Sequence, residues 1–338
     1  MTIPAARTVP MILPRLETTL PGLVGGGTVL GSGDFVTSWR EKSASGESLD
    51  GFRLLDGDDL HVKAAWRASS WSIAMLCLTD GRLLCSQLET ETSAVVRLYE
   101  MPAEGAMAGG DVVVGGDAVR EFRGHSNWIL GLAELPGGGR FAGAGGADAC
   151  VRVWDVESGA CVAVLRGHTA EVTSLAMVPS RAQLASAATD GTLRWWDVST
   201  WECVCTVWTG VPALCAQVLP GGRLAIGGRH GWMAVWDLVA RTAVARWKGH
   251  EGCVESMALL GGDRLVSGSP DRAFRLWELR GFACVACVEG LYQVHCVRAL
   301  ASNLLVVAQS YGPRRVYSFA WYRRVAAVRA WVVAWCGG

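Results

Sequence analysis

A phrase repeated at a fixed spacing constrains the fold of this 338-residue chain more than any other feature of its sequence. Each copy opens on a glycine-histidine pair and closes on a tryptophan-aspartate pair, first as Gly124-His125 with Trp154-Asp155 and then as Gly167-His168 with Trp196-Asp197. Between the pairs of the second copy lie an alternating apolar run (172–177), a run of small residues (184–188) and the turn dipeptide Asp190-Gly191. Because the alternation has the period of two that is typical of β-strands, each copy predicts three strands joined by turns. A fourth strand then leads into the next copy.

The closing tryptophan recurs with a nearly constant period. It stands at four positions spaced by 40 to 42 residues, namely Trp154, Trp196, Trp236 and Trp277. Three of them have an aspartate six residues upstream, at Asp148, Asp190 and Asp271. In these residues the chain resembles the WD-repeat (WD40) β-propeller family, whose units open on Gly-His, close on Trp-Asp and repeat every ~40–45 residues. The resemblance implies an all-β fold in which similar sheets stack around an axis.

We count seven such units, with six or eight as alternatives, and predict a seven-bladed β-propeller of four-stranded antiparallel blades over residues 23–329. Residues 1–22 are then a partly irregular N-terminal segment and residues 330–338 a C-terminal tail. In the first unit, residues 28–39 are interpreted as the second and third strands and 51–55 as the fourth. In the last unit, strands are expected at 294–300, 304–308, 316–319 and 324–328. One blade cannot bury both faces of its sheet alone, so the ring must close.

The histidine, serine, aspartate and tryptophan that recur in phase match the structural tetrad of the WD-repeat family. The resemblance implies a chain of hydrogen bonds from the indole through the hydroxyl and the imidazole to the carboxylate. Two units hold the full set, His168, Ser186, Asp190 and Trp196 in one and His250, Ser267, Asp271 and Trp277 in the other. An active site is not normally built several times around a ring. We therefore interpret these residues as internal ties that satisfy buried polar groups, and we expect the chain not to be an enzyme.

Two units depart from the tetrad. The third keeps His125, Asp148 and Trp154 but has Ala144 where the serine is expected. The fifth has Gly210, Ile226 and His230 in the places of the histidine, the serine and the aspartate. We expect packing to hold these two units more than hydrogen bonds do.

One rim of the propeller is expected to collect the segments that enter each first strand and the turns between second and third strands. In the WD-repeat family this rim commonly receives peptides or protein partners. By position, the resemblance carries that role to Ser126, Trp128, Ala147, Thr169, Glu171, Thr189, Arg229, His230, Glu251, Cys253 and Pro270. An exposed Trp128 would be a binding anchor, since aromatic side chains dominate interface energetics. A plain rim residue is the alternative.

Charge and hydropathy exclude several classes of protein. The 31 basic residues balance the 31 acidic ones, which makes nucleic acid an unlikely partner because phosphate neutralisation needs a basic face. No apolar run reaches the ~18 residues of a membrane span. Residues 1–20 carry Arg7 and Arg15 with no acid before Glu17, but they lack serine and hold three prolines, which does not favour a transit peptide. We expect a cytoplasmic protein, with the nucleus as the alternative, and no cofactor.

The twelve cysteines are explained mainly by their place in the repeat. Cys161, Cys203 and Cys284 each open the fourth strand of a unit, where we expect small buried apolar residues. Cys284 and Cys287 have half the spacing of a zinc site, but no second pair of ligands stands at the required distance, so we expect no metal. Unpaired cysteines agree with a reduced cytosolic or nuclear setting.

These observations favour a non-enzymatic scaffold or adaptor that binds partner proteins on its rim, monomeric as a propeller within a larger complex. The alternative is a substrate receptor of a cullin-type ubiquitin ligase. Residues 265–280 are similar to the motif by which some WD-repeat proteins dock on the damage-binding adaptor of these ligases. The segment ends in Trp277-Glu278-Leu279-Arg280, with Glu278 where aspartate or asparagine is expected.

Charge is segregated between the two ends of the repeat region. The first unit is acidic, with Glu41, Glu47, Asp50, Asp56, Asp58 and Asp59. No acid follows Glu289, whereas arginine accumulates at Arg298, Arg314, Arg315, Arg323, Arg324 and Arg329. Complementarity across the seam of the ring and an arginine patch for an acidic partner are both open interpretations.

Overall fold

The computed structural model describes residues 15–18, 23–30, 32, 34–42, 48–56, 62–68, 70, 72–90, 92–101, 117–260, 264–289, 293–299, 304–310, 316–318 and 329–335. Its secondary structure is almost entirely β-strand, and the described residues contain no α-helix. Two single turns of 3-10 helix, η1 (Pro179–Arg181) and η2 (Arg229–Gly231), occur in loops. The all-β fold predicted from the sequence is confirmed.

Six four-stranded antiparallel sheets, blades one to six, follow one another along the chain. Blades one to three consist of β2 (Leu23–Val29), β3 (Phe35–Lys42), β4 (Ser48–Leu55) and β5 (Val62–Ala68); β6 (Ser72–Cys77), β7 (Leu83–Thr90), β8 (Ser93–Tyr99) and β9 (Arg120–Arg123); and β10 (Ile129–Glu134), β11 (Arg140–Gly145), β12 (Val151–Asp155) and β13 (Cys161–Leu165). Blades four to six consist of β14 (Val172–Val178), β15 (Gln183–Ala188), β16 (Thr192–Asp197) and β17 (Cys203–Trp208); β18 (Ala213–Leu219), β19 (Arg223–Gly228), β20 (Trp232–Asp237) and β21 (Thr242–Lys248); and β22 (Ser256–Leu260), β23 (Arg264–Ser269), β24 (Ala273–Glu278) and β25 (Ala283–Val288).

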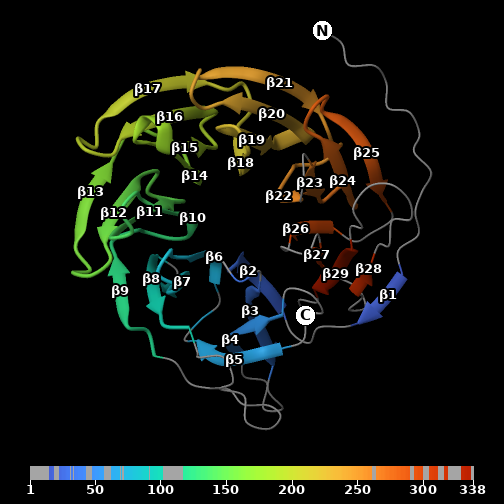
Figure 1. The fold of residues 1–338 in the computed structure, drawn as a ribbon, viewed down its shortest axis with the longest axis horizontal. Helices are drawn as coiled ribbons and strands as arrows, with labels where there is room; N and C mark the ends of the chain where they lie inside the picture. Colours follow the sequence, from blue (N-terminus) through green and yellow to red (C-terminus); the bar gives the residue numbers. More distant parts are fainter. Residues whose placement is uncertain are drawn as a thin grey trace.

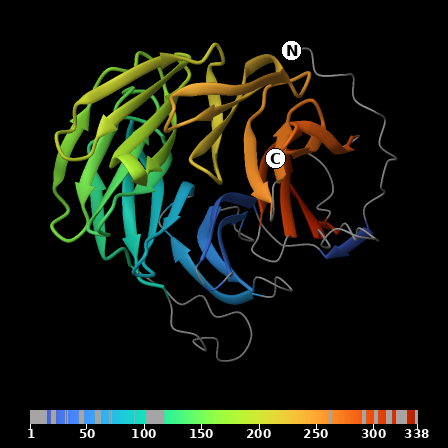
Figure 2. The ribbon, with the colours of Figure 1, turned by 45° about the horizontal axis from the view of Figure 1, so that its top comes forward.

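The blades stand in a ring around a central axis (Figure 1). The first strand of each blade lies nearest the axis and the fourth strand forms the outer wall. Figure 2 shows the strands running between the two rims of this ring. The burial of the strands follows the same order: all six residues of β15 are buried, whereas β17 has only exposed and half-buried residues. Small side chains in the second strands therefore reflect a position that is covered on both faces.

The apolar core consists of slabs between neighbouring blades. One cluster joins Ala185 and Trp195 of blade four to Leu224 and Trp236 of blade five, and equivalent clusters join each consecutive pair from blade one to blade six. Trp154, Trp195 and Trp196 are among the largest fully buried side chains. Because blades two to five each contribute one face to each of two slabs, neighbouring blades stabilise one another.

Side-chain hydroxyl and thiol groups tie one blade to the backbone of the next. The donors lie on the inner strands, and the bonds are Ser38 Oγ to Ser72 O (3.1 Å), Ser86 Oγ to Ile129 O (3.0 Å), Thr173 Oγ1 to Ala213 O (3.1 Å), Cys215 Sγ to Val254 O (3.3 Å) and Ser256 Oγ to Val297 O (3.2 Å). Between blades three and four the contact is made by Gly131, where an added Cβ would lie 3.3 Å from the Cα of Ser174. These bonds fix the stacking because buried carbonyls require a partner.

A seventh sheet of a different kind follows blade six. Strands β26 (Gln293–Ala299) and β27 (Leu304–Ser310) are antiparallel, and β29 (Arg329–Trp335) runs parallel to β27. Strand β28 (Val316–Ser318) pairs instead with β1 (Arg15–Thr18), so segments from both ends of the chain meet at this part of the ring. The first strand of blade one, β2, contacts β29.

The expectation of seven four-stranded antiparallel blades was therefore wrong in its count. The described residues form six such blades, and β26 and β27 of the expected seventh unit form a three-stranded sheet with β29, most of which lies in the segment predicted to be a C-terminal tail. The reason is that the strand expected at 316–319 pairs with β1, and β29 takes the place beside β27. The expected strand at 324–328 and the side chains of the arginines from Arg298 onward lie outside the described residues.

The prediction for the first unit was also wrong, because it gave each segment a strand position one later in the blade than the structure shows. Residues 28–39 belong to the first and second strands of blade one, 51–55 to the third, and β5 is the fourth. Strands β3 and β4 pair in register from Phe35↔Leu55 to Lys42↔Ser48, beyond the ends of the strands predicted at 28–39 and 51–55. The pairing extends into polar residues because backbone hydrogen bonds do not require apolar side chains.

Within the described residues, no helix has the length and apolar character that crossing a bilayer would need.

The close contact between blades five and six at Gly231 gives a test of the stacking. Its φ is +75°, and an added Cβ would lie 1.6 Å from the carbonyl oxygen of His250. Gly221 has nearly the same φ (+76°) but nothing within 4 Å of the Cβ position. We expect Gly221→Ala to lose about 1–2 kcal/mol from the left-handed backbone alone. Gly231→Ala should lose a further ~1–3 kcal/mol from overpacking.

Denaturant titrations of the two variants measure this difference. The same midpoint for both would show that the blades adjust their spacing freely.

Candidate functional site

The segments that enter the first strands and the turns between second and third strands share one rim, here called the histidine rim. Its histidines occur in hydrogen-bonded chains in blades four and six. In blade four, His168 Nδ1 bonds Asp190 Oδ2 (2.8 Å), His168 Nε2 bonds Ser186 Oγ (2.7 Å) and Trp196 Nε1 donates to Ser186 Oγ (2.9 Å). In blade six the corresponding distances for His250, Asp271, Ser267 and Trp277 are 2.9, 2.6 and 2.8 Å.

Each chain of bonds joins four different elements. In blade four the serine lies on β15, the tryptophan on β16, the aspartate in the turn between them and the histidine in the segment before β14. The aspartate also accepts the backbone N–H of the residue that follows the histidine, Thr169 in blade four and Glu251 in blade six. Ser186 and Ser267 are fully buried. In both tetrads the indole, hydroxyl, imidazole and carboxylate groups all have hydrogen-bond partners. This is the condition under which a buried network is stabilising.

Blade three forms a different set of bonds. His125 Nδ1 bonds Asp148 Oδ2 (2.6 Å), but His125 Nε2 bonds the carbonyl oxygen of Gly143 (3.1 Å), and Trp154 Nε1 donates to Arg123 O (3.3 Å). A backbone carbonyl thus takes the place of the serine hydroxyl that the histidine bonds in blades four and six. In blade three the tryptophan is therefore not linked to the histidine.

The residue in the place of the serine in blade three is Gly143, and our assignment of Ala144 was wrong. Gly143 pairs with Arg152 as Ser186 pairs with Arg194 in blade four. The turn before Trp154 is one residue longer, and it contains Ala149 in a left-handed conformation (φ 50°). Counting back from the tryptophan therefore gives a position that is off by one. An added Cβ at Gly143 would lie 2.9 Å from the Trp154 ring, which leaves little room for a serine there.

Blade five replaces the tetrad with apolar packing. Ile226 lies at the serine position, opposite Ala234, and is fully buried. Trp236 is 6% exposed, and its Nε1 has no hydrogen-bond partner among the described residues. His230, at the aspartate position, is exposed and has a φ of 57°. This blade has lost its internal ties and presents a histidine to solvent instead.

The ionisable groups of the complete tetrads have shifted pKa values. Burial lowers the pKa of His168 below its ordinary value, although Asp190 opposes this shift. Burial alone would raise the pKa of Asp271, but the hydrogen bond and charge of His250 and the amide N–H of Glu251 lower it to about 2. The pKa of Asp190 is lowered in the same way, against its burial, by Thr192, Thr169 and His168. The carboxylates are thus held ionised as acceptors.

The structure places the predicted rim residues in two groups by exposure. Seven are exposed: Ser126, Ala147, Thr169, Glu171, Arg229, His230 and Glu251. Four are half-buried: Trp128, Thr189, Cys253 and Pro270. The backbone of Trp128 accepts from Gly146 N (2.8 Å), which anchors this segment to the neighbouring turn.

A more exposed aromatic surface lies where blades four and five adjoin, and the sequence reasoning missed it. Trp208 ends β17 of blade four, whereas Trp232 and Arg246 lie on β20 and β21 of blade five. Trp208 is 66% exposed and Trp232 is 37% exposed. Between them, Arg246 Nη2 donates to Gly210 O (2.9 Å), and its guanidinium carbon lies 4.5 Å from the centroid of the Trp232 ring. We call Trp208, Arg246 and Trp232 the blade-five strip.

Two glycines leave room for the Trp208 indole to lie against the rim. An added Cβ at Gly191 would lie 2.7 Å from the ring of Trp208, and one at Gly210 would lie 3.8 Å from its Nε1 and 2.8 Å from Arg246 Nη1. Trp208 occupies the strand-end position that Arg166 and Lys248 hold in blades three and five. A tryptophan where other units carry a cation was the signal that could have found this surface.

The described residues contain one group of three potential metal ligands, His125, Asp148 and Cys150, with ligand atoms within 4.8 Å of one another. Burial raises the pKa of Cys150 to about 12, and the charge of Asp148 adds to this effect. The thiol is therefore protonated at neutral pH, and His125 Nδ1 already bonds Asp148. The group is explained as part of the internal tie of blade three.

The cysteines at the start of the fourth strands are more exposed than expected. The ten described cysteines are free thiols, and Cys161 and Cys203 are exposed rather than buried. Each lies beside an arginine of the adjacent strand: Arg152 Nη1 is 3.9 Å from Cys161 Sγ, and Arg194 Nη1 is 3.9 Å from Cys203 Sγ. The expectation of buried residues was wrong because these strands form the outer wall of the ring.

Comparisons with known proteins agree with this geometry. The WD40 family, described as WD domain, G-beta repeat, matches residues 116–155, 159–197 and 241–278. These segments end at or next to the closing tryptophans of blades three, four and six, the blades in which a histidine-aspartate pair is present. The chain therefore contains three WD40 repeats over these segments.

Several curated proteins are similar to part of the chain. Nuclear distribution protein PAC1 of Arthroderma otae is 27% identical over 194 residues, which are 48% of this chain and 42% of that protein. Pre-mRNA-processing factor 19 of Bos taurus is 33% identical over 115 residues, 33% of this chain and 23% of that protein. DENN domain and WD repeat-containing protein SCD1 of Arabidopsis thaliana is 32% identical over 134 residues, which are 38% of this chain and 11% of that protein. The chain therefore matches less than half the length of each of these relatives.

The tetrad of blade six predicts the cost of removing its central hydroxyl. Ser267→Ala leaves Trp277 Nε1 and His250 Nε2 without a partner, and we expect a loss of about 1–3 kcal/mol in the free energy of unfolding. Ser269→Ala is the matched control, because Ser269 is equally buried on the same strand but accepts only the backbone N–H of Asp271 (3.1 Å). Chemical denaturation of both variants measures the difference. An equal or larger loss from Ser269→Ala would contradict the coupling of the tetrad.

The lowered pKa of Asp271 predicts a dependence of stability on pH. A carboxyl whose pKa is lower in the folded state stabilises fully above its unfolded value, about 4, and the effect is lost as the pH falls towards 2. Asp271→Asn cannot titrate, so the wild type should be more stable than this variant at pH 7. The difference should shrink between pH 4 and pH 2. Denaturation midpoints across this range test it, and a constant difference would rule out the contribution of this carboxylate.

Proposed function

We propose that this WD-repeat protein is a non-enzymatic scaffold whose histidine rim binds partner proteins or peptides. The observation that carries the proposal is the blade-five strip. Trp208 is 66% exposed, and tryptophan and arginine are among the residues that most often dominate binding energy. Arg246 forms no ion pair among the described residues, so its charge is available to a partner.

The remaining rim positions fit a broad interface around this strip. Arg229 and His230 precede Trp232 in the same turn, and both are exposed. Across the next blade, Glu251 pairs with Lys248 (2.6 Å) at the edge of the same surface. A mixed aromatic and basic centre with a polar border is the composition of many protein interfaces.

The histidines and aspartates of the rim support a role in positioning these residues rather than in catalysis. Both ring nitrogens of His168 and of His250 are engaged within the tetrads, and the rings are almost fully buried. We therefore propose no catalytic residue and no cofactor. We also propose a monomeric propeller within a larger complex, located in the cytoplasm or the nucleus, with which the names of a nuclear distribution protein and a pre-mRNA-processing factor among its relatives are compatible.

A second candidate function is substrate receptor of a cullin-type ubiquitin ligase. One observation favours it: Arg280, the last residue of the segment 265–280, is exposed in the turn after β24. Glu278, at the position where aspartate or asparagine is expected, is exposed as well.

Affinity capture with quantitative mass spectrometry tests the scaffold. We expect Trp208→Ser combined with Arg246→Ala to reduce recovery of the main partners about tenfold or more, because an anchor residue typically contributes more than the 1.4 kcal/mol that a tenfold change requires. The matched control combines Val204→Ser and Arg181→Ala, which remove an exposed apolar residue and an exposed arginine away from the histidine rim.

Equal loss of partners in both variants would overturn the assignment of the rim. Recovery of the adaptor of a cullin ligase, lost on Arg280→Ala but retained in the rim variant, would favour the second function.

A further inference from the structure

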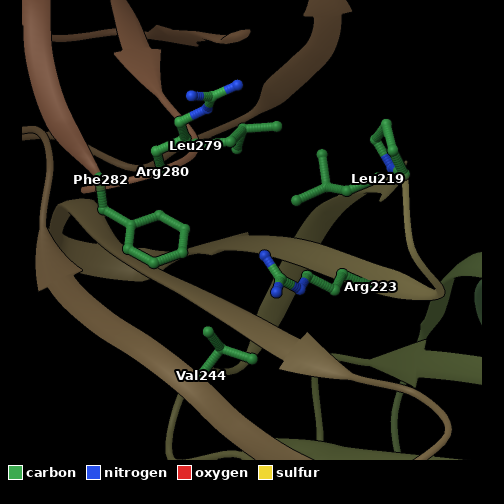
Figure 3. A pocket seen from close by; sticks show the side chains of 7 residues that line it. Leu219, Arg223, Val244, Leu279, Arg280 and Phe282 are labelled. Atoms are coloured by element: carbon green, nitrogen blue, oxygen red, sulfur yellow. The ribbon is translucent and has the colours of Figure 1, made fainter. Parts of the chain in front are cut away.

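A groove lies between blades five and six on the rim opposite the histidines. It has a volume of about 360 Å³ and is lined by Leu219, Pro220, Arg223, Val244, Leu279, Arg280 and Phe282 (Figure 3). Leu219 ends β18, Arg223 begins β19 and Val244 lies on β21, whereas the last three residues belong to the turn between β24 and β25. The groove is thus formed by two blades and depends on their stacking.

The floor of the groove is apolar and fixed by the core beneath it. Leu219 and Leu279 are nearly buried, and the Phe282 ring lies 5.2 Å from the ring of Trp247. The backbone N–H of Phe282 donates to Glu278 O (2.8 Å), in a left-handed turn that Trp201 and Arg241 repeat in blades four and five. The backbone conformation that positions the Phe282 ring is therefore the same as in the corresponding turns of blades four and five.

The wall of the groove on blade five exposes apolar surface to solvent. Val244 is 42% exposed. Two further valines at the same end of blade five, Val218 and Val239, are 42% and 36% exposed. Exposed apolar residues that gather at the mouth of a groove are typical of a binding surface.

Two arginines supply the charge of the groove. Arg223 extends toward Phe282 and Val244, and Arg280 lies on the other side, above Phe282 (Figure 3). None of the seven lining residues is acidic. Asp237 is opposite Arg223 in the strand register, but its Oδ1 accepts the N–H groups of Val239 (2.9 Å) and Ala240 (2.7 Å), and Arg223 forms no ion pair among the described residues. The seven lining residues therefore carry two positive charges and no negative one.

A second cavity shows that this charge is not a general property of the gaps between blades. The cavity between blades one and two, of about 500 Å³, is lined by Leu30, Ser32, Cys77, Leu78, Thr79, Gly81 and Met101, none of which is charged. The combination of an apolar floor and paired arginines distinguishes the groove between blades five and six.

We propose that this groove binds a short acidic segment of a partner protein. An apolar side chain of the segment enters between Leu219, Val244 and Phe282, and a carboxylate beside it pairs with Arg223, while Arg280 adds positive charge on the other side. Arginine suits this role because its planar guanidinium binds a carboxylate through two parallel hydrogen bonds. Nucleic acid fits less well, since it requires a row of cations along a phosphate backbone, and the net charge of the chain is zero. The proposal rests on the scaffold function but concerns a different surface.

Fluorescence polarisation with a synthetic peptide tests the proposal. The probe is a fluorescein-labelled nonapeptide with one central leucine, two aspartates on each side of it and glycine-serine ends. We expect saturable binding to the full chain that weakens as NaCl rises from 50 to 500 mM. Arg223→Glu should weaken binding about tenfold or more, the effect of losing about 1.4 kcal/mol. Val244→Ser should weaken it by a smaller factor.

The matched control is Arg181→Glu, because Arg181 is an exposed arginine in the corresponding turn of blade four and forms no ion pair among the described residues. It should bind the probe as the wild type does. Two control peptides separate the two parts of the recognition: asparagine in place of aspartate removes the charge, and serine in place of leucine removes the apolar contact. Both should bind at least about tenfold more weakly.

Three results would overturn the proposal: equal weakening by Arg181→Glu and Arg223→Glu, undiminished binding of the asparagine peptide, or no saturable binding of the aspartate peptide at low salt. Binding of a labelled twelve-nucleotide oligothymidine that Arg223→Glu abolishes, without binding of the peptide, would assign the groove to nucleic acid instead. The Trp208→Ser and Arg246→Ala variant leaves the groove unchanged and should still bind the peptide. Failure of the groove and failure of the histidine rim are therefore distinguishable.

Discussion

Face-to-face packing between neighbouring blades is the interaction on which the rest of the structure depends. No single four-stranded sheet can bury both of its faces, and the apolar clusters accordingly bridge consecutive blades from one to six. Hydroxyl donors such as Ser38, Ser86 and Thr173 then fix the spacing by bonding a carbonyl of the next blade. Both candidate binding surfaces arise where loops of adjacent blades meet, so they exist only while this packing holds.

The same structural requirement is met by different chemistry in different blades. Ser186 and Ser267 link tryptophan to histidine, the carbonyl of Gly143 takes the bond of His125, and Ile226 fills the position with apolar volume. An arginine also lies against the glycine in the segment that enters each of blades four and five, but it comes from a different strand in the two blades. Arg194 on β16 lies against Gly167, whereas Arg246 on β21 lies against Gly210. Blade five, which has lost its tetrad, is the blade that contributes to both exposed aromatic and charged surfaces.

The two surfaces differ in shape and therefore in the partner that each can hold. The blade-five strip is open, with Trp208 and Trp232 on either side of Arg246, and suits a broad protein interface. The groove near Arg223 and Arg280 is concave and suits a short segment with an apolar side chain. Because they lie on opposite rims, one propeller could hold two partners at once without competition between them.

The sequence by itself determined the repeat, the all-β fold and the members of the two complete tetrads. Periodic Trp, Asp and His positions report local strands and turns, and these depend mainly on neighbouring residues. Only the tertiary structure decided the number of four-stranded blades, because β28 pairs with β1 and β29 pairs with β27, and such distant pairings leave no local pattern. It also decided that Gly143 stands at the serine position, since one extra residue in a turn shifts the register. The blade-five strip and the groove likewise depend on which side chains from separate segments meet in space, as Trp208 meets Arg246 beside Gly210, and the linear order of residues does not contain that information.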